Sequence, residues 1–392
     1  MVKNLINREH KRQHTKINMI ASENVVSRDV MFAMGSCFTN KYAEGYPGGR
    51  YYNGNEFADC VEEYAVDLVK KLFLADHANV QPHSGSQANQ AAYMAVLKPG
   101  DTILAMSLDA GGHLTHGAPV SQAGQIYKFV HYGLDKNGVI DYKQLEDLAK
   151  KNKPKLIIAG GSAYSLIIDF DRISKAAKSI GAYFMVDMAH FAGLVASGLY
   201  PNPCKWADIV TSTTHKTLRG PRGGLILCTE ALAKAIDKAV FPGIQGGPCI
   251  HTIAAKAVCF EEALSPSFKV YSQNVVNYTA YLCKELQKEG LKMVGGGTES
   301  HLFLIDLSDT NKSGREVADD LEKRFGIVVN KNKVVNDKRS AKETSGVRVG
   351  LAYITNNKKV DINVLNEIRD IFLHVILDRP EPKIKLLKKV FK

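Results

Sequence analysis

The sequence lacks the cysteine pairs that would build a disulfide framework or hold a metal ion. Its seven cysteines are scattered among 392 residues, and no two of them form a Cys-x-x-Cys pair. This usage is typical of small buried thiols in a reducing compartment. We therefore expect neither a disulfide framework nor a metal site.

Long apolar runs are also missing. No run is long enough to span a bilayer, and residues 1–14 are positively charged without the apolar stretch of a secretory signal. The presence of Glu9 and the lack of serine in this segment also argue against a transit peptide. These absences predict a cytoplasmic protein, and a hydrophobic fraction of 45% is typical of a globular chain with a sizeable core.

Acidic residues are in the minority. The chain has 51 lysines and arginines against 40 aspartates and glutamates, which gives a net charge of +11. Such an excess is compatible with nucleic-acid binding, but the lysines are dispersed and no RNA-recognition motif is present. We expect the charge to favour an anionic cofactor and substrate, with nucleic acid at most a secondary partner.

Strand-like and helix-like segments alternate from about residue 56 to residue 265. Short apolar runs occupy residues 156–159, 183–186, 209–210 and 225–228, and a helical pattern at 171–180 is closed by Gly181. Such alternation predicts an α/β domain with a largely parallel, buried sheet. In that architecture ligands bind at the carboxyl ends of the strands.

The pattern changes near Ser265 and Pro266. A long helix is expected over 270–290, a strand over 301–307, a helix over 317–325 and another strand over 345–350. We predict three parts: a helical N-terminal arm (1–30), a large cofactor-binding domain (31–269) and a smaller α+β domain (270–392).

The most informative segment is Thr211-Ser-Thr-Thr-His-Lys-Thr-Leu-Arg-Gly-Pro-Arg-Gly-Gly224. It surrounds Lys216 with hydroxyls, the imidazole of His215 and two guanidinium groups. A lysine that forms an imine needs neighbours that bind a phosphate and tune its charge. We therefore expect Lys216 to carry pyridoxal 5′-phosphate as a Schiff base.

Asp187 ends an apolar run that precedes Lys216. A carboxylate at this place can pair with a protonated pyridine nitrogen and keep the ring an electron sink. Taken alone, Asp187 is as well explained as a helix cap or a loop residue. His190, three residues later, is indecisive by itself, because it fits polar packing as well as a cofactor contact.

Ser84, Gly85 and Ser86 open a predicted helix that runs to residue 96. Their hydroxyls and backbone N–H groups would lie at a helix N-terminus, where a phosphate binds well. Ordinary capping by serine is the alternative. His113 lies in a glycine-flanked loop, where its imidazole could stack on an aromatic cofactor or remain solvated.

Two further segments have the composition of binding elements. Residues 42–54 combine tyrosines, glycines and Glu44 in a turn-rich loop, where binding residues concentrate. Glu44 is a candidate acid or base, and docking on a partner subunit is compatible with that role. Arg348 stands on a predicted strand, where its guanidinium could clamp a carboxylate or form a surface salt bridge.

Together these segments resemble serine hydroxymethyltransferase, a pyridoxal-phosphate enzyme of the aminotransferase-like superfold (fold type I). The resemblance runs from about residue 20 to residue 350 and is specific because ten motifs occur in order. They are Ile20-Ala-Ser-Glu-Asn24, Tyr42-Ala-Glu-Gly-Tyr-Pro47, Arg50-Tyr-Tyr52, Pro82-His-Ser-Gly-Ser86, Gly112-His-Leu-Thr-His-Gly117, Ser162-Ala-Tyr-Ser165, Val186-Asp-Met-Ala-His190, Thr213-Thr-His-Lys-Thr-Leu218, Phe241-Pro-Gly-Ile-Gln-Gly-Gly247 and Asn330-Lys-Asn332.

The resemblance implies roles for these residues. Lys216 anchors the cofactor, Asp187 pairs with the pyridine nitrogen, and Glu44 transfers a proton near the substrate hydroxyl and the folate. The remaining cofactor contacts are His113 on the ring, Ser162 and His190 on its phenolic side, and Ser84, Gly85, Ser86 and His215 on the phosphate, helped by Tyr42 and Gly247 of the other subunit of a homodimer. The substrate contacts are Ser22, Tyr52 and Arg348 for the amino acid, with Arg348 on its carboxylate, and Leu108, Leu114 and Asn332 for the folate.

The implied reaction is the reversible conversion of L-serine and tetrahydrofolate to glycine and 5,10-methylenetetrahydrofolate in one-carbon metabolism. The alternative is a folate-independent aldolase that acts on β-hydroxy amino acids such as threonine. It would use the same Lys216 and Asp187 chemistry without contacts from Leu108 or Asn332. The chain departs from the family pattern at Leu166, at 335–338 and at 350–358, of which the last two border the folate and carboxylate regions.

Overall fold

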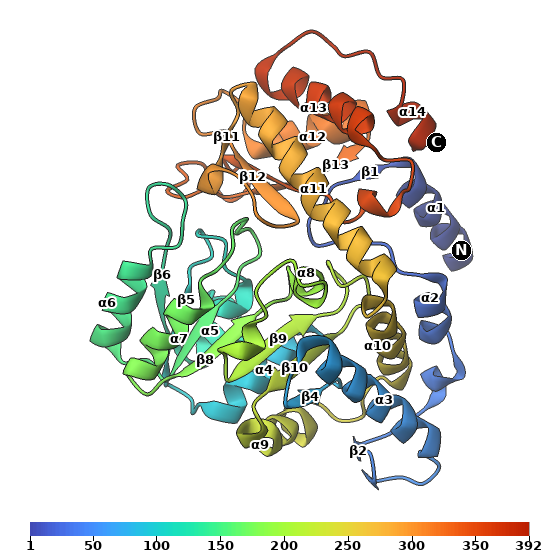
Figure 1. Ribbon diagram of the computed structural model, residues 1–392, viewed down its shortest axis with the longest axis vertical. Coiled ribbons are helices and arrows are strands. Elements are labelled where there is room, and N and C mark those ends of the chain that lie inside the picture. Colours follow the sequence, from blue (N-terminus) through green and yellow to red (C-terminus); the bar gives the residue numbers. More distant parts are fainter. Residues whose placement is uncertain (392) are drawn as a thin grey trace.

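A seven-stranded sheet forms the centre of the larger part of the molecule in the computed structural model, which describes residues 1–391 (Figure 1). Neighbouring strands are parallel except at β10, which runs antiparallel to both β4 and β9. The strand order is β4 (His77–Asn79), β10 (Gly224–Cys228), β9 (Ile209–Thr213), β8 (Tyr183–Asp187), β7 (Leu156–Ala159), β5 (Thr102–Met106) and β6 (Lys128–Tyr132).

Helices cover both faces of this sheet. Alternate residues of each strand enter two separate apolar cores: Leu104 and Ile157 face one layer of helices, and Ile103 and Ile158 face the other. The first layer is α3 (Glu56–Phe73), α6 (Tyr142–Asn152), α7 (Phe170–Ser179), α8 (Ala192–Ala196) and α10 (Ile250–Ala263); the second is α4 (Gly85–Val96), α5 (Gln122–Ile126) and α9 (Ala233–Lys238). The predicted α/β class is thereby confirmed.

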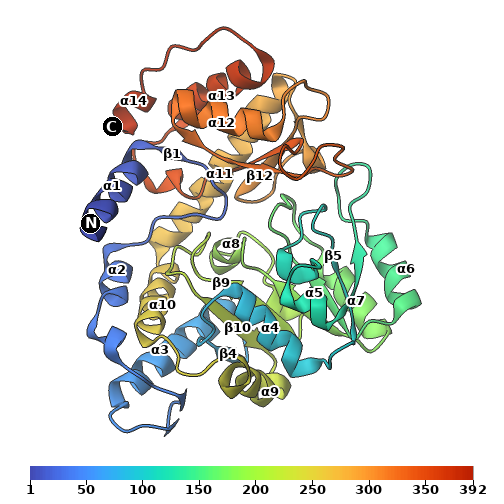
Figure 2. The same cartoon turned by 180° about the vertical axis from the view of Figure 1, so that it is seen from behind.

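A second, antiparallel sheet lies in the smaller part, which Figure 2 shows above the large sheet from behind. Its own apolar core joins the sheet to the helices that pack on it. The strand order is β11 (Lys292–Met293), β12 (Leu302–Asp306), β15 (Gly346–Gly350) and β14 (Asn330–Asn332), and the helices are α12 (Gly314–Phe325), α13 (Ile362–Leu377), α14 (Leu387–Val390) and the second half of α11 (Pro266–Lys288).

Helix α11 connects the two parts. Phe268, Tyr271 and Val275 pack into the core of the large sheet, whereas Leu282 and Leu286 pack into the core of the small one. The predicted boundary at residue 270 therefore falls inside a continuous helix. The division into three domains stays a prediction.

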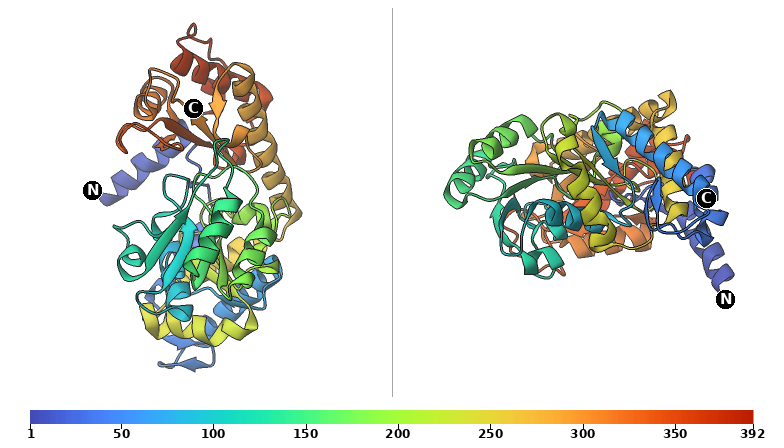
Figure 3. Two further views of the ribbon diagram at one scale, coloured as in Figure 1. Left: turned by 90° about the vertical axis from the view of Figure 1, so that its left-hand side faces the viewer. Right: turned by 90° about the horizontal axis from the view of Figure 1, so that it is seen from below.

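The N-terminal arm is only partly helical. Helix α1 (Val2–Thr15) has no buried residue and projects from the body in both views of Figure 3. The chain is then extended, and β1 (Ile17–Asn18) pairs in parallel with β13 (Ile327–Val328). The expectation that the arm (1–30) is helical was wrong after Thr15, because Ile17 and Met19 are buried in the core of the small sheet.

The remaining segments follow the sequence pattern closely. The helix expected at 171–180 is α7, and the strands expected at 301–307 and 345–350 are β12 and β15. A hairpin of β2 (Gly45–Tyr46) and β3 (Gly49–Arg50) and helix α2 (Arg28–Met34) complete the structure. Within residues 1–391, no helix is both long and apolar enough to cross a bilayer.

Candidate active site

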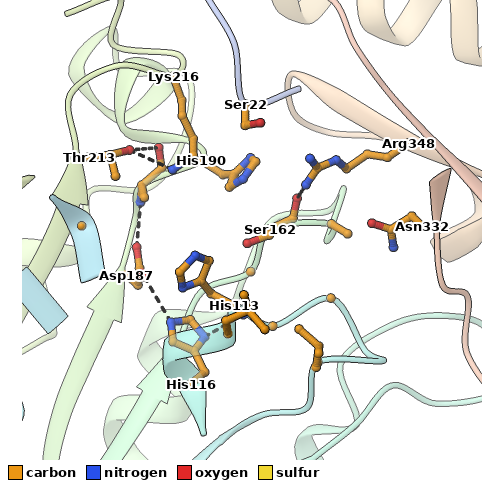
Figure 4. A pocket seen from close by; sticks show the side chains of 18 of the residues that line it. Ser22, His113, His116, Ser162, Asp187, His190, Thr213, Lys216, Asn332 and Arg348 are labelled. Carbon is orange, nitrogen blue, oxygen red and sulfur yellow. Dashed lines mark hydrogen bonds and ion pairs between the residues drawn. The ribbon is translucent and has the colours of Figure 1, made fainter. Parts of the chain in front are cut away.

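A cavity of about 720 Å³ lies between the two sheets, at the carboxyl ends of β5, β7, β8 and β9. Strands β14 and β15 of the small sheet line its other side (Figure 4). Most of the predicted site residues meet here. They are Ser22, Ser84, Gly85, Ser86, Leu108, His113, Leu114, Ser162, Asp187, His190, His215, Lys216, Asn332 and Arg348.

Lys216 follows β9 and extends into this cavity. Its Nζ donates a hydrogen bond to Oγ1 of Thr213 at 2.9 Å, and its backbone carbonyl accepts one from the Asn24 amide at 2.7 Å. Burial lowers the pKa of Lys216 to about 8; the Asp187 carboxylate opposes this shift and the cations Arg348 and Arg222 add to it. A substantial neutral fraction near neutral pH makes this amine a competent nucleophile.

Asp187 ends β8 and is held as an anion. Burial alone would raise the pKa of its carboxyl, but hydrogen bonds from His116 Nε2 at 3.1 Å and Asn89 Nδ2 at 2.9 Å, with the charge of His116, bring the pKa below its usual range. The backbone N–H of Ala189 also donates to it, at 3.1 Å. Neither His116 nor Asn89 was predicted; the only signal for His116 was its place in the same loop as His113.

The first turn of α4 presents an anion site to the cavity. Ser84 is the N-cap and its hydroxyl accepts the N–H of Gln87, as the capping alternative predicted, while the N–H groups of Gly85 and Ser86 have no acceptor among residues 1–391. A Cβ on Gly85 would lie 2.6 Å from Thr213 Cγ2, so only glycine allows this approach. Unpaired N–H groups at a helix start suit a phosphate.

His215 and Arg222 also line the cavity, on the chain beside Lys216. Burial, with the charges of Lys216 and Arg222, lowers the pKa of His215 to about 3, so its ring is neutral. Its Nδ1 is buried and, within residues 1–391, makes no hydrogen bond. A buried polar atom without a partner fits a ligand that completes the site.

The imidazoles of His113 and His190, which also lie in the cavity, are neutral because burial lowers their pKa values. Nδ1 of His113 lies 2.7 Å from Oγ1 of Thr115. Nδ1 of His190 lies 3.3 Å from Nε2 of His301, a residue that was not predicted, and the two rings stack with centroids 5.5 Å apart. Thr115 therefore holds the His113 ring in place, and His301 holds the His190 ring in place.

Arg348 reaches the cavity from β15. Its Nε donates to Asn330 Oδ1 at 3.1 Å, and one Nη donates to the backbone carbonyl of Ser162 at 2.5 Å. Burial lowers the pKa of Arg348 to about 10, which leaves the guanidinium charged at neutral pH. Ser22 lines the same cavity (Figure 4). A buried cation with polar neighbours is suited to a substrate carboxylate.

Four predicted residues lie outside the cavity and form a separate group, here called the loop cluster: Tyr42, Glu44, Tyr52 and Gly247. Glu44 accepts hydrogen bonds from the Tyr42 hydroxyl at 3.3 Å and the Tyr52 hydroxyl at 3.1 Å. A Cβ on Gly247 would lie 3.1 Å from the Tyr42 ring. Tyr42 and Tyr52 are 58% and 50% exposed, so one chain leaves this group open to solvent.

Comparison with known proteins gives the family. The family model described as serine hydroxymethyltransferase matches residues 1–371. The chain belongs to the serine hydroxymethyltransferase family. A serine hydroxymethyltransferase of Coprothermobacter proteolyticus is 58% identical over 352 residues, which cover 90% of this chain and 85% of that protein.

Family membership confirms the predicted enzyme class, cofactor and co-substrate. Serine hydroxymethyltransferases are pyridoxal-phosphate enzymes of fold type I, use tetrahydrofolate as co-substrate and act as oligomers. This chain is accordingly a pyridoxal-phosphate-dependent hydroxymethyltransferase. The cavity fits the cofactor on its own geometry, because it sets an amine of lowered pKa, a carboxylate that is only 11% exposed and a free helix N-terminus around one space.

Proposed function

We propose that this cavity carries the reversible transfer of the hydroxymethyl carbon of L-serine to tetrahydrofolate, with the predicted residues in the roles given below. The observation that supports it most is the meeting of Lys216, Asp187 and the start of α4 on one side with Arg348 on the other. This places cofactor anchors and a carboxylate clamp across a single cavity.

Lys216, Asp187 and the α4 turn would hold the cofactor. Lys216 would bind its aldehyde, Asp187 would pair with the pyridine nitrogen, and Ser84, Gly85, Ser86 and His215 would bind the phosphate. When bound, the cofactor supplies a protonated pyridine ring that delocalises the negative charge left at the substrate Cα. Asp187 keeps that nitrogen protonated, because a buried anion favours the charged form of its partner. His113 would pack on the ring, and Ser162 and His190 would contact its phenolic side.

Arg348 and Ser22 would bind the amino acid. The guanidinium of Arg348 is oriented by Asn330 and by the Ser162 carbonyl, so its place is set before substrate arrives. Leu108 and Leu114, each 50% exposed, lie on the cavity wall, where they can pack on the folate ring, and Asn332 can bond its polar edge. Only this folate side separates a transferase from a folate-independent aldolase.

The loop cluster would complete the cavity of a second copy in a homodimer. In that position Tyr42 and Gly247 help to bind the phosphate, Tyr52 contacts the amino acid, and Glu44 transfers a proton near the substrate hydroxyl. The exposure of the two tyrosines supports this arrangement, because apolar ring surface left in water is stabilised when a partner covers it.

Serine cleavage measured with and without tetrahydrofolate tests the proposal. We expect conversion of serine to glycine to depend on added tetrahydrofolate and to yield 5,10-methylenetetrahydrofolate in equal amount. Threonine cleavage in the same preparation serves as the comparison. Equal rates of serine cleavage with and without the folate would favour the aldolase instead.

We also propose a cytoplasmic location. The support is chemical: all seven cysteines are free thiols in the structure, as a reducing compartment would keep them. Cell fractionation followed by immunodetection tests it, and recovery of the protein in a secreted or membrane fraction would contradict it.

A further inference from the structure

Lys256 is buried beneath the cofactor cavity and has no place in the roles described above. It lies on α10 and is 1% exposed. Its Nζ donates to three backbone carbonyls, those of Val80 at 2.6 Å, Gly224 at 2.7 Å and Pro82 at 3.0 Å. An ammonium has three donors and no acceptor, so this geometry satisfies the charged form completely.

Gln245 holds the same turn from a second direction. Its Nε2 donates to the Gln81 carbonyl at 3.0 Å, and its Oε1 accepts the backbone N–H of His83 at 3.0 Å. Lys256 and Gln245 are together called the socket. The socket binds the carbonyls of residues 80, 81 and 82 in succession, and the N–H that follows them.

The turn held by the socket leads directly into the anion site. Ser84, Gly85 and Ser86 follow it and line the cavity. The turn is also bonded to β10, because the N–H of Gly224 donates to the Pro82 carbonyl at 3.0 Å. A Cβ on Gly224 would lie 2.3 Å from the Ser84 carbonyl oxygen, so glycine at this position lets β10 approach the start of α4 closely.

The hydrogen bonds of Lys256 hold the turn that precedes Ser84 in a fixed position. Three backbone carbonyls point at Lys256, two of them from the turn that precedes Ser84, so the lysine fixes where the turn ends and α4 begins. The lysine charge is compensated locally by carbonyls and not by a carboxylate among its hydrogen-bond partners. Burial lowers the pKa of Lys256 to about 7, so the lysine acts on the anion site through the position of the turn that it holds and not through a fixed charge.

We propose that Lys256 and Gln245 are positioning residues for phosphate recognition. They set the orientation of the first N–H groups of α4 without touching the ligand. The inference rests on the proposed binding of the cofactor phosphate at Ser84, Gly85 and Ser86. It predicts that the socket determines how strongly the enzyme prefers a phosphorylated aldehyde over the same aldehyde without phosphate.

The test compares the binding of pyridoxal 5′-phosphate and pyridoxal to the apoenzyme. Both ligands offer Lys216 the same aldehyde, so only the phosphate differs. In Lys256→Met and Gln245→Leu we expect the affinity for pyridoxal 5′-phosphate to fall about tenfold, as for the loss of hydrogen bonds around a charged ligand. The affinity for pyridoxal should change less than about twofold, because Lys216, which binds the aldehyde, is unchanged in both variants and independent sites affect one another little.

Lys238→Met, an exposed lysine at the end of α9, is the matched control and should change neither affinity. An equal loss for both ligands would show a merely structural role and overturn the inference, as would unchanged affinities. If Lys256→Met does not fold, Gln245→Leu decides by the same ratio. A wild-type enzyme with no preference for the phosphorylated aldehyde would instead refute the phosphate site itself.

Inorganic phosphate gives a second readout that involves no aldehyde. We expect phosphate to raise the Tm of the wild-type apoenzyme, because a ligand that binds only the folded state stabilises it. The socket variants should show a smaller phosphate-dependent rise than Lys238→Met does. An undiminished rise in both socket variants would overturn the inference.

Discussion

The cavity and the loop cluster contain residues of the same predicted site, yet they differ in burial and in the number of fixed hydrogen-bond partners. In the cavity, Asp187 and Arg348 each have partners fixed by hydrogen bonds from other elements of the same chain. In the loop cluster, the Glu44 carboxylate accepts side-chain hydrogen bonds, within residues 1–391, only from the two exposed tyrosines Tyr42 and Tyr52. One group is organised within the chain, and the other is presented on its surface.

This difference indicates which functions a single chain can organise. In the cavity, burial lowers the pKa of Lys216, and fixed hydrogen-bond donors favour the ionised form of Asp187. Presenting a glutamate to another subunit requires exposure. On the proposed roles, a single chain prepares most of the cofactor site, while the phosphate contacts of Tyr42 and Gly247 and proton transfer by Glu44 depend on assembly. We expect this difference between the two groups to be visible in the following measurements, given in order of decreasing effect.

Removal of the cavity amine should have the largest effect. We expect Lys216→Ala to lose turnover by about 1000-fold or more, the scale seen when a covalent catalytic residue is removed. The visible absorbance of the protein-bound cofactor should disappear as well, because the imine with the protein cannot form. Retained absorbance in the variant would mean that another lysine is the anchor.

Arg348→Ala should weaken serine binding by about 100-fold, because a buried carboxylate would lose its paired charge. The effect should appear mainly in KM, measured against Arg324→Ala, an exposed arginine of α12, as the control. Arg348→Lys should recover only part of the loss, since lysine cannot make the same forked contact. An unchanged dissociation constant for serine would refute this role.

The pKa of Lys216 predicts how cofactor capture depends on pH. Below a pKa of about 8 the amine is mostly protonated and lacks the lone pair that attacks an aldehyde. The rate of pyridoxal 5′-phosphate capture by the apoenzyme should therefore rise about tenfold per pH unit at low pH and level off above 8. Stopped-flow absorbance measures it.

The Asp187→Asn variant tests whether the Asp187 carboxylate contributes to the pKa of Lys216 in the same pH experiment. The Asp187 carboxylate favours the ammonium form of Lys216, so its removal should move the midpoint to lower pH. Because the same cofactor is used with both enzymes, its own ionisation cancels in the comparison. A midpoint near the ordinary lysine pKa of 10.5 would show that burial does not control this amine.

Mixing two inactive variants tests the loop cluster. Lys216→Ala chains and Glu44→Ala chains are co-expressed, so that hybrid dimers form. If Glu44 serves the partner's cavity, each hybrid has one intact cavity, and random pairing should restore roughly a quarter of wild-type activity. Each variant expressed alone is the control. No recovery in verified hybrids would mean that Glu44 serves its own chain or neither cavity.

Local pattern was sufficient for most of the fold. Period-two and period-3.6 apolar spacing located α7, β12 and β15 to within about two residues. Local pattern gave the wrong structure after Thr15, where we expected a helix and the structure has strand β1. This strand forms only by pairing with β13, more than three hundred residues away. A strand of two residues has too little local signal to be predicted.

By itself, the sequence determined the chemistry of this protein: a lysine among hydroxyls, an aspartate after an apolar strand, serines at a helix start and an arginine on a strand. Residue type and order along the chain are sufficient for that. The tertiary structure alone decided the rest: that His116 and Asn89 make Asp187 an anion, that Lys256 of α10 supports the α4 turn, and that Glu44 lies away from Lys216. Those facts depend on how distant elements pack, and burial, which sets the energies of charges, is a property of the packed molecule.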